Sequence, residues 1–471
     1  MIVTNDLCEK ISLAKGEKPF LHEIVSINHH MAHIASAYYL SGFDRSACLV
    51  LDANGTFYDQ GRYSEIESSG FAERGKIYLT NTQYSKADKF QTSSLGHFYL
   101  FITYQCGFNF GEEGKVMGLA PYGDGRYVEI LRKAMDPQRH NYMNEEIRKT
   151  VFELRDQNTS DHKFKENLAF AAQTLLEENL FLICNQVYER TKSRNLCYAG
   201  GLALNSVANG KLKRNTPFEE VFVFPAAGDG GTAVGAALYG YYTIGGHVYH
   251  EEQIRSVFWG KEYSKNETEL ALYRYRDRIT YTYETYNIIY KQTAKALSRG
   301  KIVGWFQDGA ETGPRALGNR SILTAPHIPN MKNILNAKVK FRESFRPFAP
   351  AILEEAVTEY FDTDFPNNPF MLFVGNVLPS KRDIIPAVTH IDHSARFQTV
   401  NQKDHPKFYR LIQEFLIITG IPVVLNTSFN IKGEPIVETP ADAIKSFLQS
   451  DMDLLVIGRF VVNKKGRKLN E

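Results

Sequence analysis

The chain has 471 residues, of which 43% are hydrophobic and 23% charged, and its formal net charge is +2. A balance this close to neutral excludes a global field that would draw the protein to nucleic acid, so any preference for anions must be local. At about 100–200 residues per domain, the length predicts two or three domains.

The cysteines and the N-terminus indicate the compartment. The five cysteines are scattered without a CxxC pair, which is usual in a reducing compartment. Residues 1–23 lack the apolar core of a signal peptide, and no apolar run approaches the roughly 18 residues of a membrane span. We therefore expect a cytoplasmic protein that binds neither membranes nor nucleic acid.

The first predicted element is a helix over residues 28–39, which is rich in alanine and free of glycine and proline. His29 and His33 stand one turn apart on this helix, a spacing that can place two imidazoles on one metal ion. Surface or core histidines of an ordinary helix show the same spacing, so both interpretations stay open at this point.

A buried strand is predicted over residues 47–52, where it ends in Asp52. A tight turn with Gly55 follows. Turns of this kind lie against nucleotide phosphates in actin-like sugar kinases, and they also close plain hairpins. A mostly buried helix over residues 94–107 comes next.

Residues 111–123 hold Glu113 and Lys115 among four glycines and a proline. We expect a loop there, with backbone that lies close to a ligand. Most of residues 125–195 is predicted scaffold, with an amphipathic helix over residues 167–183 as its clearest element.

A strand over residues 195–199 runs into Gly200 and Gly201, and Asn205 stands where a helix begins. Paired glycines let a ligand approach the backbone, and a helix N-terminus favours an anion or a polar ring edge.

The strand at residues 221–224 runs into Gly228, Asp229 and Gly230 at a second strand-to-helix turn. The Asp229 carboxylate could complete a metal site with the two histidines, as in facial triads, or it could cap the following helix.

Composition changes over residues 241–280, where we place a domain boundary.

The most basic stretch is residues 312–350, after a helix over residues 286–297 and a strand over residues 301–306. It carries seven cations against Glu343 alone: Arg315, Arg320, Lys332, Lys338, Lys340, Arg342 and Arg346. Glycines and prolines interrupt it, so we expect turns that let several cations converge on an anion, with phenylalanines holding part of the segment buried.

A last strand over residues 422–425 runs into Ser428 and Asn430, which could floor a small polar pocket or form an ordinary turn. We expect Arg315, Lys340 and Arg346 to converge on one phosphate-bearing ligand with Ser428 and Asn430 opposite, and the partner of Lys340 to be that ligand.

Taken together, ten motifs resemble the O-carbamoyltransferase family of nodulation-factor and antibiotic biosynthesis. They occur in the family's order across roughly residues 28–445. They are HHMAH, VLDANG, SLGHFY, EEGKVMGLAPYG, YAGGLALN, GDGGTAVGAAL, GPRALGNRSIL, FRPFAP, ARFQTV and LNTSFN.

The resemblance implies an α/β protein of two modules. Residues 1–262 would form a threonylcarbamoyl-transferase-like module of the actin-like ATPase (ASKHA) type, and residues 280–471 a YrdC-like module. The second module would make carbamoyladenylate from carbamoyl phosphate and ATP. The first, with Fe(II) or another divalent metal such as Mg²⁺, would transfer the carbamoyl group to a hydroxyl of a small molecule.

The family's roles fall on residues already singled out. The catalytic residues would be Arg315, Lys340, Arg346, Ser428 and Asn430. The metal ligands would be His29, His33 and Asp229. The substrate and nucleotide contacts would be Asp52, Gly55, Glu113, Lys115, Gly200, Gly201, Asn205, Gly228 and Gly230.

One departure concerns the start of the chain, because members of the family usually carry about 100 further residues before the HHMAH helix, a length typical of part of such a module. The alternative to an enzyme is therefore a nucleotide-binding partner subunit that needs a separate N-terminal polypeptide. A homodimer is a further expectation, and the acceptor is not readable from these residues.

Overall fold

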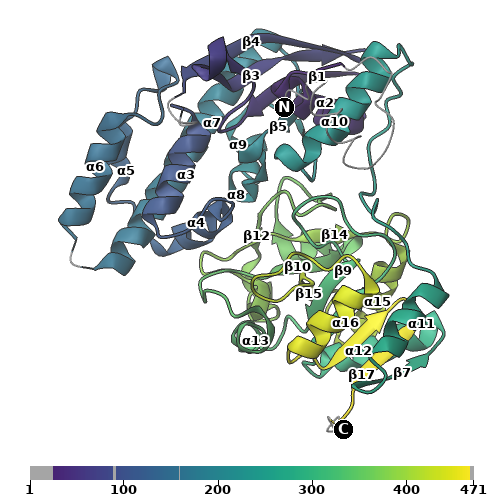
Figure 1. Ribbon diagram of the computed structural model, residues 1–471. Coiled ribbons are helices and arrows are strands. Elements are labelled where there is room, and N and C mark those ends of the chain that lie inside the picture. Colours follow the sequence, from purple (N-terminus) through teal and green to yellow (C-terminus); the bar gives the residue numbers. More distant parts are fainter. Residues whose placement is uncertain (1–24, 88–91, 159, 467–471) are drawn as a thin grey trace.

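The structure is a computed structural model and describes residues 25–87, 92–158 and 160–466 (Figure 1). The expected absence of a signal peptide over residues 1–23 concerns residues outside this part. We call residues 25–262 the N-terminal region and residues 263–466 the C-terminal region. Each region is built around its own sheet, and both are α/β.

The N-terminal sheet combines antiparallel and parallel strands. Strand β3 pairs antiparallel with β4 and with β1, and β1, β5 and β6 pair parallel. The short β2 pairs with the first residues of β3. Its strands are β1 (Arg45–Leu51), β2 (Phe57–Tyr58), β3 (Tyr63–Glu73), β4 (Lys76–Lys86), β5 (Asn195–Ala199) and β6 (Glu220–Val223). Every residue of β1 after Arg45 is buried, because helices cover both faces of this central strand.

The helices of the N-terminal region lie on this sheet or extend from it (Figure 1). Helices α2 and α10 pack together, and α2 lies on β1 and β5, while the long α7 packs against β1 and β3. The helices are α2 (His29–Ser41), α3 (Leu95–Gln105), α4 (Glu113–Leu119), α5 (Val128–Ala134), α6 (Glu145–Asp156), α7 (Asp161–Thr191), α8 (Ser206–Asn209), α9 (Leu212–Asn215) and α10 (Thr232–Tyr239).

The C-terminal sheet has eight strands in the order β14-β10-β15-β9-β8-β16-β17-β7, and β11, β12 and β13 form a small separate sheet. The strands are β7 (Ile279–Tyr283), β8 (Val303–Phe306), β9 (Arg320–Thr324), β10 (Ala349–Leu353), β11 (Phe361–Asp362), β12 (Gly375–Val377), β13 (Ser394–Ala395), β14 (Gln398–Val400), β15 (Val423–Ser428), β16 (Leu454–Ile457) and β17 (Phe460–Lys464). Only the pairs β10–β14 and β8–β16 are parallel.

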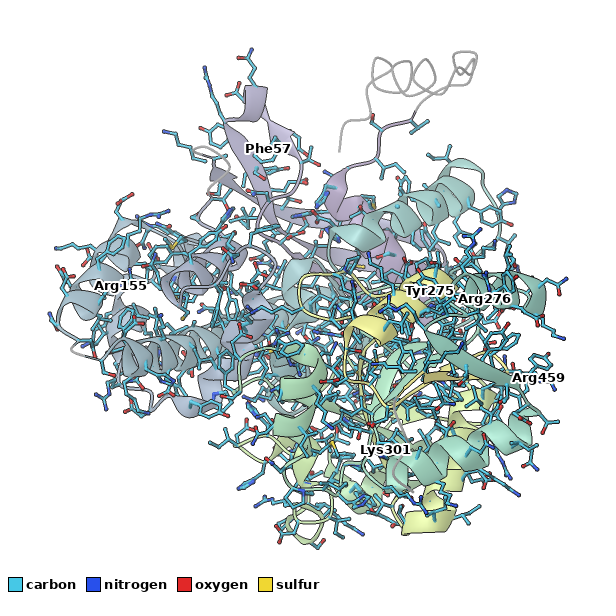
Figure 2. All side chains as sticks on the ribbon, turned by 60° about the horizontal axis from the view of Figure 1, so that its bottom comes forward. Phe57, Arg155, Tyr275, Arg276, Lys301 and Arg459 are labelled. Carbon is cyan, nitrogen blue, oxygen red and sulfur yellow. The ribbon has the colours of Figure 1, made fainter. Side chains whose placement is uncertain are left out.

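Alternate side chains of these strands enter two different cores. Val424 packs with α12 and α15, whereas its neighbours Val423 and Leu425 pack with α16, so both faces of the sheet are covered. The helices of this region are α11 (Lys265–Arg274), α12 (Tyr286–Ser298), α13 (Met331–Leu335), α14 (Val357–Tyr360), α15 (Pro406–Thr419) and α16 (Pro440–Gln449). Arg155 on α6 and Arg459 between β16 and β17 mark opposite sides of the molecule (Figure 2).

The two regions are in direct contact. The loop that carries Phe365, Phe370 and Phe373 leaves the C-terminal region and packs into the core of the N-terminal region. The Arg214 guanidinium pairs with Asp362 at 2.8 Å and with Asp364 at 2.5 Å. No helix in the described ranges is both long and apolar enough to traverse a bilayer.

Two predicted loops contain regular structure. Residues 113–119 form α4 despite Gly114 and Gly118, and Gly118 packs against Pro347 and Phe345 of the other region. Within residues 312–350, β9, α13 and a π-helical turn (η7, Asn336–Lys340) form where glycine and proline are sparse. The cations Arg315, Arg342 and Arg346 remain in loops, as expected.

Candidate metal centre and anion-binding site

Three parallel strands of the N-terminal sheet deliver polar groups to one edge. Asp52 follows β1, the turn Gly200–Gly201 follows β5, and Asp229 follows β6. In open α/β sheets this carboxyl edge is where ligands bind. Helix α2 brings His29 and His33 to the same place, with its first turn capped by the Asn28 side chain.

Four side chains meet there in the geometry of a metal site. The two imidazole Nε2 atoms of His29 and His33 are 3.0 Å apart. Asp52 Oδ2 lies 2.9 Å from His33 Nε2 and 3.5 Å from His29 Nε2, and Asp229 Oδ1 lies 3.5 Å from both. All four donor atoms fall within 4.8 Å of one another.

The electrostatics of this cluster favour a cation. Burial opposes charge on His29, but hydrogen bonds to Asp229 and Asp52 outweigh it and raise its pKa to about 9. The same carboxylates raise the pKa of His33, while the two imidazoles hold the pKa values of Asp52 and Asp229 well below their usual range.

The residues present fit a divalent metal. Asp52 Oδ2 is buried and faces the two imidazoles, so a cation bound between these side chains would be coordinated by it. Two imidazoles and two carboxylates are a donor set that suits first-row transition metals, and the exposed Asp229 side chain leaves one side open. The side chain of Asp229 caps no helix, which removes the alternative role for this residue.

The glycine turns shape the same edge. Gly200 has φ +95°, and a Cβ there would lie 2.1 Å from the Leu51 carbonyl oxygen, so only glycine fits. Gly201 lies against Asp52, and Gly228 lies against Gly201. Nothing lies within 4 Å of where a Cβ of Gly230 would be, so this position is open.

Asn205 and Gly55 are tied to protein groups. The Asn205 side chain caps α8 and exchanges amide hydrogen bonds with Gln173 in the buried interior. A Cβ at Gly55 would lie 2.6 Å from His30 Nε2, so this glycine makes room for a buried histidine.

A second cluster, the cation cluster, gathers five basic side chains of the C-terminal region: Arg315, Lys340, Arg342, Arg346 and Arg396. Burial and the charge of Arg346 lower the pKa of Arg315 to about 10, and burial with Arg346 lowers the pKa of Arg342 to about 9. Burial and neighbouring arginines also lower the pKa of Lys340 and of Arg396 well below their usual values.

Few carboxylates balance this cluster. Glu343 acts on Arg342, at long range Glu434 acts on Lys340, and within the described residues none acts on Arg315 or Arg396. The Nε atoms of Arg315, Arg342 and Arg396 are buried and have no hydrogen-bond partner. Partly buried cations that lie together with few counter-charges are costly, and a bound anion would offset this cost.

Lys340, Ser428 and Asn430 come together, but in a different relation from the expected one. The Lys340 ammonium donates to Ser428 O at 2.6 Å and Asn430 Oδ1 at 2.8 Å, with Ser428 Oγ and Asn430 O at 3.1 and 3.0 Å. The expectation that the partner of Lys340 is a ligand is therefore wrong for the free protein, because the lysine holds the end of β15 in place.

Lys115 links the cation cluster to the N-terminal region. Its ammonium lies 2.6 Å from Glu112 and 2.7 Å from Glu343, and Glu343 lies 3.6 Å from Arg346. Glu113 accepts a hydrogen bond from the backbone N–H of Gly111, so its carboxylate shapes the start of α4.

One short helical turn connects the two sites. Gly201, at the start of the 3₁₀ turn η4 (Gly201–Leu204), lies against Asp52, and the Leu204 carbonyl at its end accepts from Arg315 Nη2 at 3.5 Å. At about 2 Å per residue, this turn spans roughly 6 Å. The metal cluster and the cation cluster are therefore neighbours across the contact between the regions.

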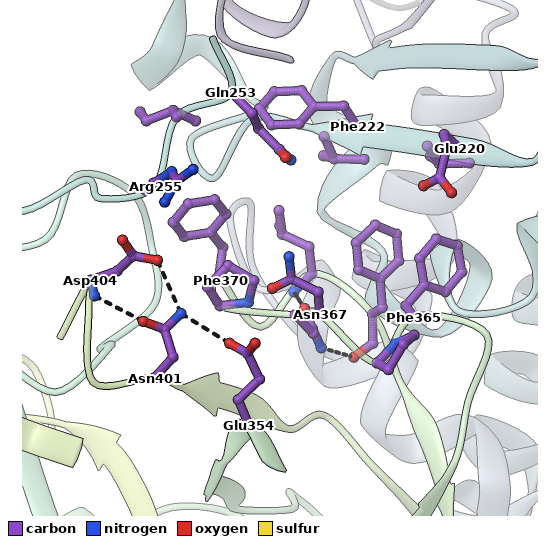
Figure 3. Close-up of a pocket in the computed structure, with 18 of the residues that line it drawn as sticks. Glu220, Phe222, Gln253, Arg255, Glu354, Phe365, Asn367, Phe370, Asn401 and Asp404 are labelled. Atoms are coloured by element: carbon purple, nitrogen blue, oxygen red, sulfur yellow. Dashed lines mark hydrogen bonds between the residues drawn. The ribbon is translucent and has the colours of Figure 1, made fainter. Parts of the chain in front are cut away.

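A cavity of about 870 Å³ lies elsewhere, between the two regions. Glu354 and Asn401 line it at the ends of β10 and β14 (Figure 3). Arg346 and Arg396 precede the same two strands. Five residues of β-strand span roughly 17 Å, so the cavity is at the opposite end of these strands from the cation cluster.

Three residues of the two clusters were not predicted in these roles. Asp52 was expected among the nucleotide contacts, whereas the structure puts it between both histidines. Arg342 and Arg396 had no predicted site role. Arg342 belongs to the basic stretch that pointed to the anion site, but Arg396 follows 50 residues after Arg346, and only the fold joins the two.

Both regions match models of one family. Residues 4–238 match the Carbamoyltransferase N-terminus and residues 294–464 the Carbamoyltransferase C-terminus. Nodulation protein NolO of Bradyrhizobium diazoefficiens is 36% identical, over 94% of this chain and 80% of that protein. Nodulation protein NolNO of Sinorhizobium fredii is also 36% identical, over 93% of this chain and 64% of that protein.

Two further similarities were found. An uncharacterized Synechocystis protein, sll1178, is 35% identical over 94% of this chain and 77% of that protein. The crystal structure of full-length HypF in its phosphate- and nucleotide-bound form is similar over 40% of this chain and 22% of that chain, with 17% identity and a TM-score of 0.27. On the strength of the family models and the sequence relatives, this chain belongs to the carbamoyltransferase family and is an enzyme that transfers a carbamoyl group.

Proposed function

We propose that the chain forms carbamoyladenylate from carbamoyl phosphate and ATP at the cation cluster. The transfer of its carbamoyl group to a small-molecule hydroxyl would follow at the edge that carries the metal cluster. The observation that carries this proposal is the group of five basic side chains, in which the buried Nε atoms of Arg315 and Arg396 have no hydrogen-bond partner and, among the described residues, no carboxylate acts on either side chain. Two phosphate-bearing substrates would supply the missing negative charge.

The activation half-reaction fits the charges of this cluster. Water cleaves carbamoyl phosphate to carbamate and phosphate, and a carbamate oxygen then attacks the α-phosphorus of ATP while pyrophosphate leaves. Charge grows on phosphoryl oxygens in both steps, and fixed guanidinium groups stabilise such charge without reorganising. Arg315, Arg342, Arg346 and Arg396 would supply these contacts, and Lys340 would hold Ser428 and Asn430 beside them.

The transfer half-reaction joins the acceptor oxygen to the carbamoyl carbon, releases AMP, and frees the proton of the hydroxyl. A divalent metal at His29, His33, Asp52 and Asp229, which we propose to be Fe(II), would act as a Lewis acid. The glycine turns Gly200–Gly201 and Gly228–Gly230 would let the nucleotide approach the backbone. A sugar, an antibiotic or a nucleoside would be the acceptor class, in a cytoplasmic setting.

The finer fold and domain assignments belong to the same proposal. Residues 1–262 would be the actin-like ATPase-type module, and the antiparallel trio β4-β3-β1 followed by parallel β5 and β6 supports this. Residues 280–471 would be the YrdC-like module, which is supported by the cation cluster and the Lys340–Ser428–Asn430 contacts.

The test supplies carbamoyl phosphate labelled at its carbonyl carbon, ATP and a panel of hydroxyl acceptors. The proposal predicts AMP, pyrophosphate and a labelled carbamate ester of one acceptor class. A chain that releases no AMP with any acceptor, with and without added Fe(II), would contradict it. If transfer appears only when a separate N-terminal polypeptide is added, the partner-subunit reading is correct and the activation half still stands.

A further inference from the structure

The loop that carries Arg315 is fixed from one side by a single carboxylate oxygen. Glu311 Oε1 accepts hydrogen bonds from the backbone N–H groups of Leu317 at 2.7 Å, Asn319 at 2.8 Å and Arg320 at 3.1 Å. Three N–H donors on one oxygen close residues 311–320 into a compact loop. We call this loop the Arg315 loop.

The other side of the Arg315 loop is fixed by amide side chains. Asn426 donates to the Ala316 carbonyl at 3.1 Å and Gln398 to the Leu317 carbonyl at 2.7 Å. Gly313 and Gly318 have φ angles of +117° and +110°, which only glycine adopts readily. A loop with two such residues lacks the repeating backbone hydrogen bonds of a helix or strand, so the Glu311, Asn426 and Gln398 side chains hold its shape.

The Arg315 side chain itself is held weakly. Its Nε atom is buried without a partner, and its Nη2 atom reaches only the Leu204 carbonyl at 3.5 Å. Within the described residues no carboxylate acts on it, and burial with the repulsion of Arg346 lowers its pKa. The direction of this guanidinium therefore depends on the loop backbone.

We infer that Glu311 is a positioning residue: its carboxylate presets the Arg315 loop so that the Arg315 guanidinium faces the bound phosphate or carbamoyl phosphate. The inference rests on the proposed function, since it assumes that the cation cluster binds such an anion. Glu311 touches no substrate in this account and acts through Arg315. A guanidinium that is already oriented loses less conformational entropy when the anion binds, which raises the affinity without a new contact.

The experiment measures the dissociation constant of carbamoyl phosphate by calorimetry for wild type, Glu311→Ala, Arg315→Ala and the double variant. One contact from a charged donor is worth roughly a 10-fold to 100-fold change in affinity, so both single variants should weaken binding by about 10-fold or more. The double variant should be no weaker than Arg315→Ala, because two residues that act as a unit are not additive.

Conservative variants separate positioning from folding. Glu311→Gln keeps the oxygen that accepts the three N–H groups and should bind within about threefold of wild type. Glu311→Asp keeps a carboxylate on a side chain that is one carbon shorter, so its affinity for carbamoyl phosphate should lie between those of Glu311→Gln and Glu311→Ala. This variant keeps the test valid if Glu311→Ala does not fold. Glu267→Ala is the matched control, because Glu267 accepts from the Ser264 N–H in a capping box on α11, away from the cluster.

The outcomes distinguish the two levels of the account. If Arg315→Ala weakens binding but both Glu311→Ala and Glu311→Asp leave it within about twofold, the inference fails and the proposed function stands. Additive losses in the double variant also overturn the inference, because Glu311 would then act independently of Arg315. If Arg315→Ala leaves the affinity unchanged, the anion site itself is misassigned.

Discussion

At the scale of single residues, the cation cluster opposes stability. Arg396 is half-buried, its Nε atom has no partner, and the neighbouring arginines depress its pKa. A buried cation without a counter-charge costs free energy that an apolar side chain of similar volume would not cost. A bound anion, as proposed for the cation cluster, would offset this cost.

The first prediction follows from this opposition. Arg396→Met should raise the free energy of unfolding by about 1–2 kcal/mol, since it removes a repelled charge and keeps the volume. The same change should weaken carbamoyl phosphate binding by about 10-fold or more. Urea unfolding and calorimetry measure the two effects, and a variant that loses stability and keeps affinity would show that Arg396 serves the fold.

The second prediction concerns the metal cluster. Protein purified without chelator should contain about one equivalent of a divalent metal, and His33→Ala and Asp52→Ala should each lose most of it. His162→Ala is the control, because His162 is exposed and pairs only with Glu166 on the surface of α7. Elemental analysis decides, and unchanged metal in Asp52→Ala would restrict the site to the other three side chains.

Residue identities could be predicted from the sequence only where the spacing is local. His29 and His33 share one helix face, and Asp229 is marked by its glycine-flanked turn, so the sequence sufficed to nominate them. Asp52 joins them because β1 is parallel to β5 and β6, which brings the carboxyl ends of the three strands to one edge. Arg396 joins the cluster through the pairing of β14 with β10.

At the scale of elements, strands that end in a polar residue or a glycine turn were the most readable features. The apolar runs that end before Asp52, before Gly200 and at Leu425 have the length and composition of buried strands. Helix α4 was missed because two of its seven residues are glycine, which argues for a loop by local propensity. Gly118 packs against Pro347 and Phe345 of the C-terminal region, and the sequence around α4 gives no sign of this contact.

The third prediction tests the turn after β5. Gly200→Ala should lower the free energy of unfolding by several kcal/mol, because its Cβ would lie 2.1 Å from a backbone oxygen that cannot move without breaking the pairing of β1. Gly433→Ala has a similar positive φ of +87° but nothing within 4 Å, so it isolates the backbone strain alone, which we expect to cost about 1–2 kcal/mol. Equal urea midpoints for the two variants would contradict the prediction, because they would mean that the backbone around Gly200 can move to accommodate a Cβ.

The fourth prediction is that the free energy of the contact between His140, in the loop before α6, and Glu67, on β3, depends on pH. The hydrogen bond that the His140 imidazole donates to Glu67, at 3.1 Å, raises the pKa of His140, against burial and the charge of Arg190. A raised folded pKa stabilises the protein below about pH 6.5, the unfolded value, and this contribution is lost as the pH rises through the folded pKa.

The coupling between the two side chains isolates this effect. A double-mutant cycle with His140→Gln and Glu67→Gln should give a favourable coupling at pH 5.5 that shrinks at pH 9. Because His140 is partly exposed, we expect about 1 kcal/mol or less. A coupling that is the same at both values would mean that the interaction does not depend on imidazolium.

At the scale of the whole molecule, the central feature is the contact between two regions that carry different chemistry. Lys115 bonds Glu343, His390 bonds the Gly118 carbonyl, and Arg315 reaches the Leu204 carbonyl, so each region contributes to the surroundings of the cation cluster. The order of the motifs along the chain indicates two modules, but which faces meet is set by these long-range contacts. The sequence alone offers no local signal for them.

The most direct test is the exchange of labelled pyrophosphate into ATP, measured with and without carbamoyl phosphate. The account predicts exchange by the wild-type chain that requires carbamoyl phosphate and falls by a factor of about 10²–10³ in Arg315→Ala, by analogy with the loss of a charge-stabilising donor. Exchange that proceeds equally without carbamoyl phosphate, or that survives in Arg315→Ala, would contradict the assignment of carbamoyladenylate formation to the cation cluster.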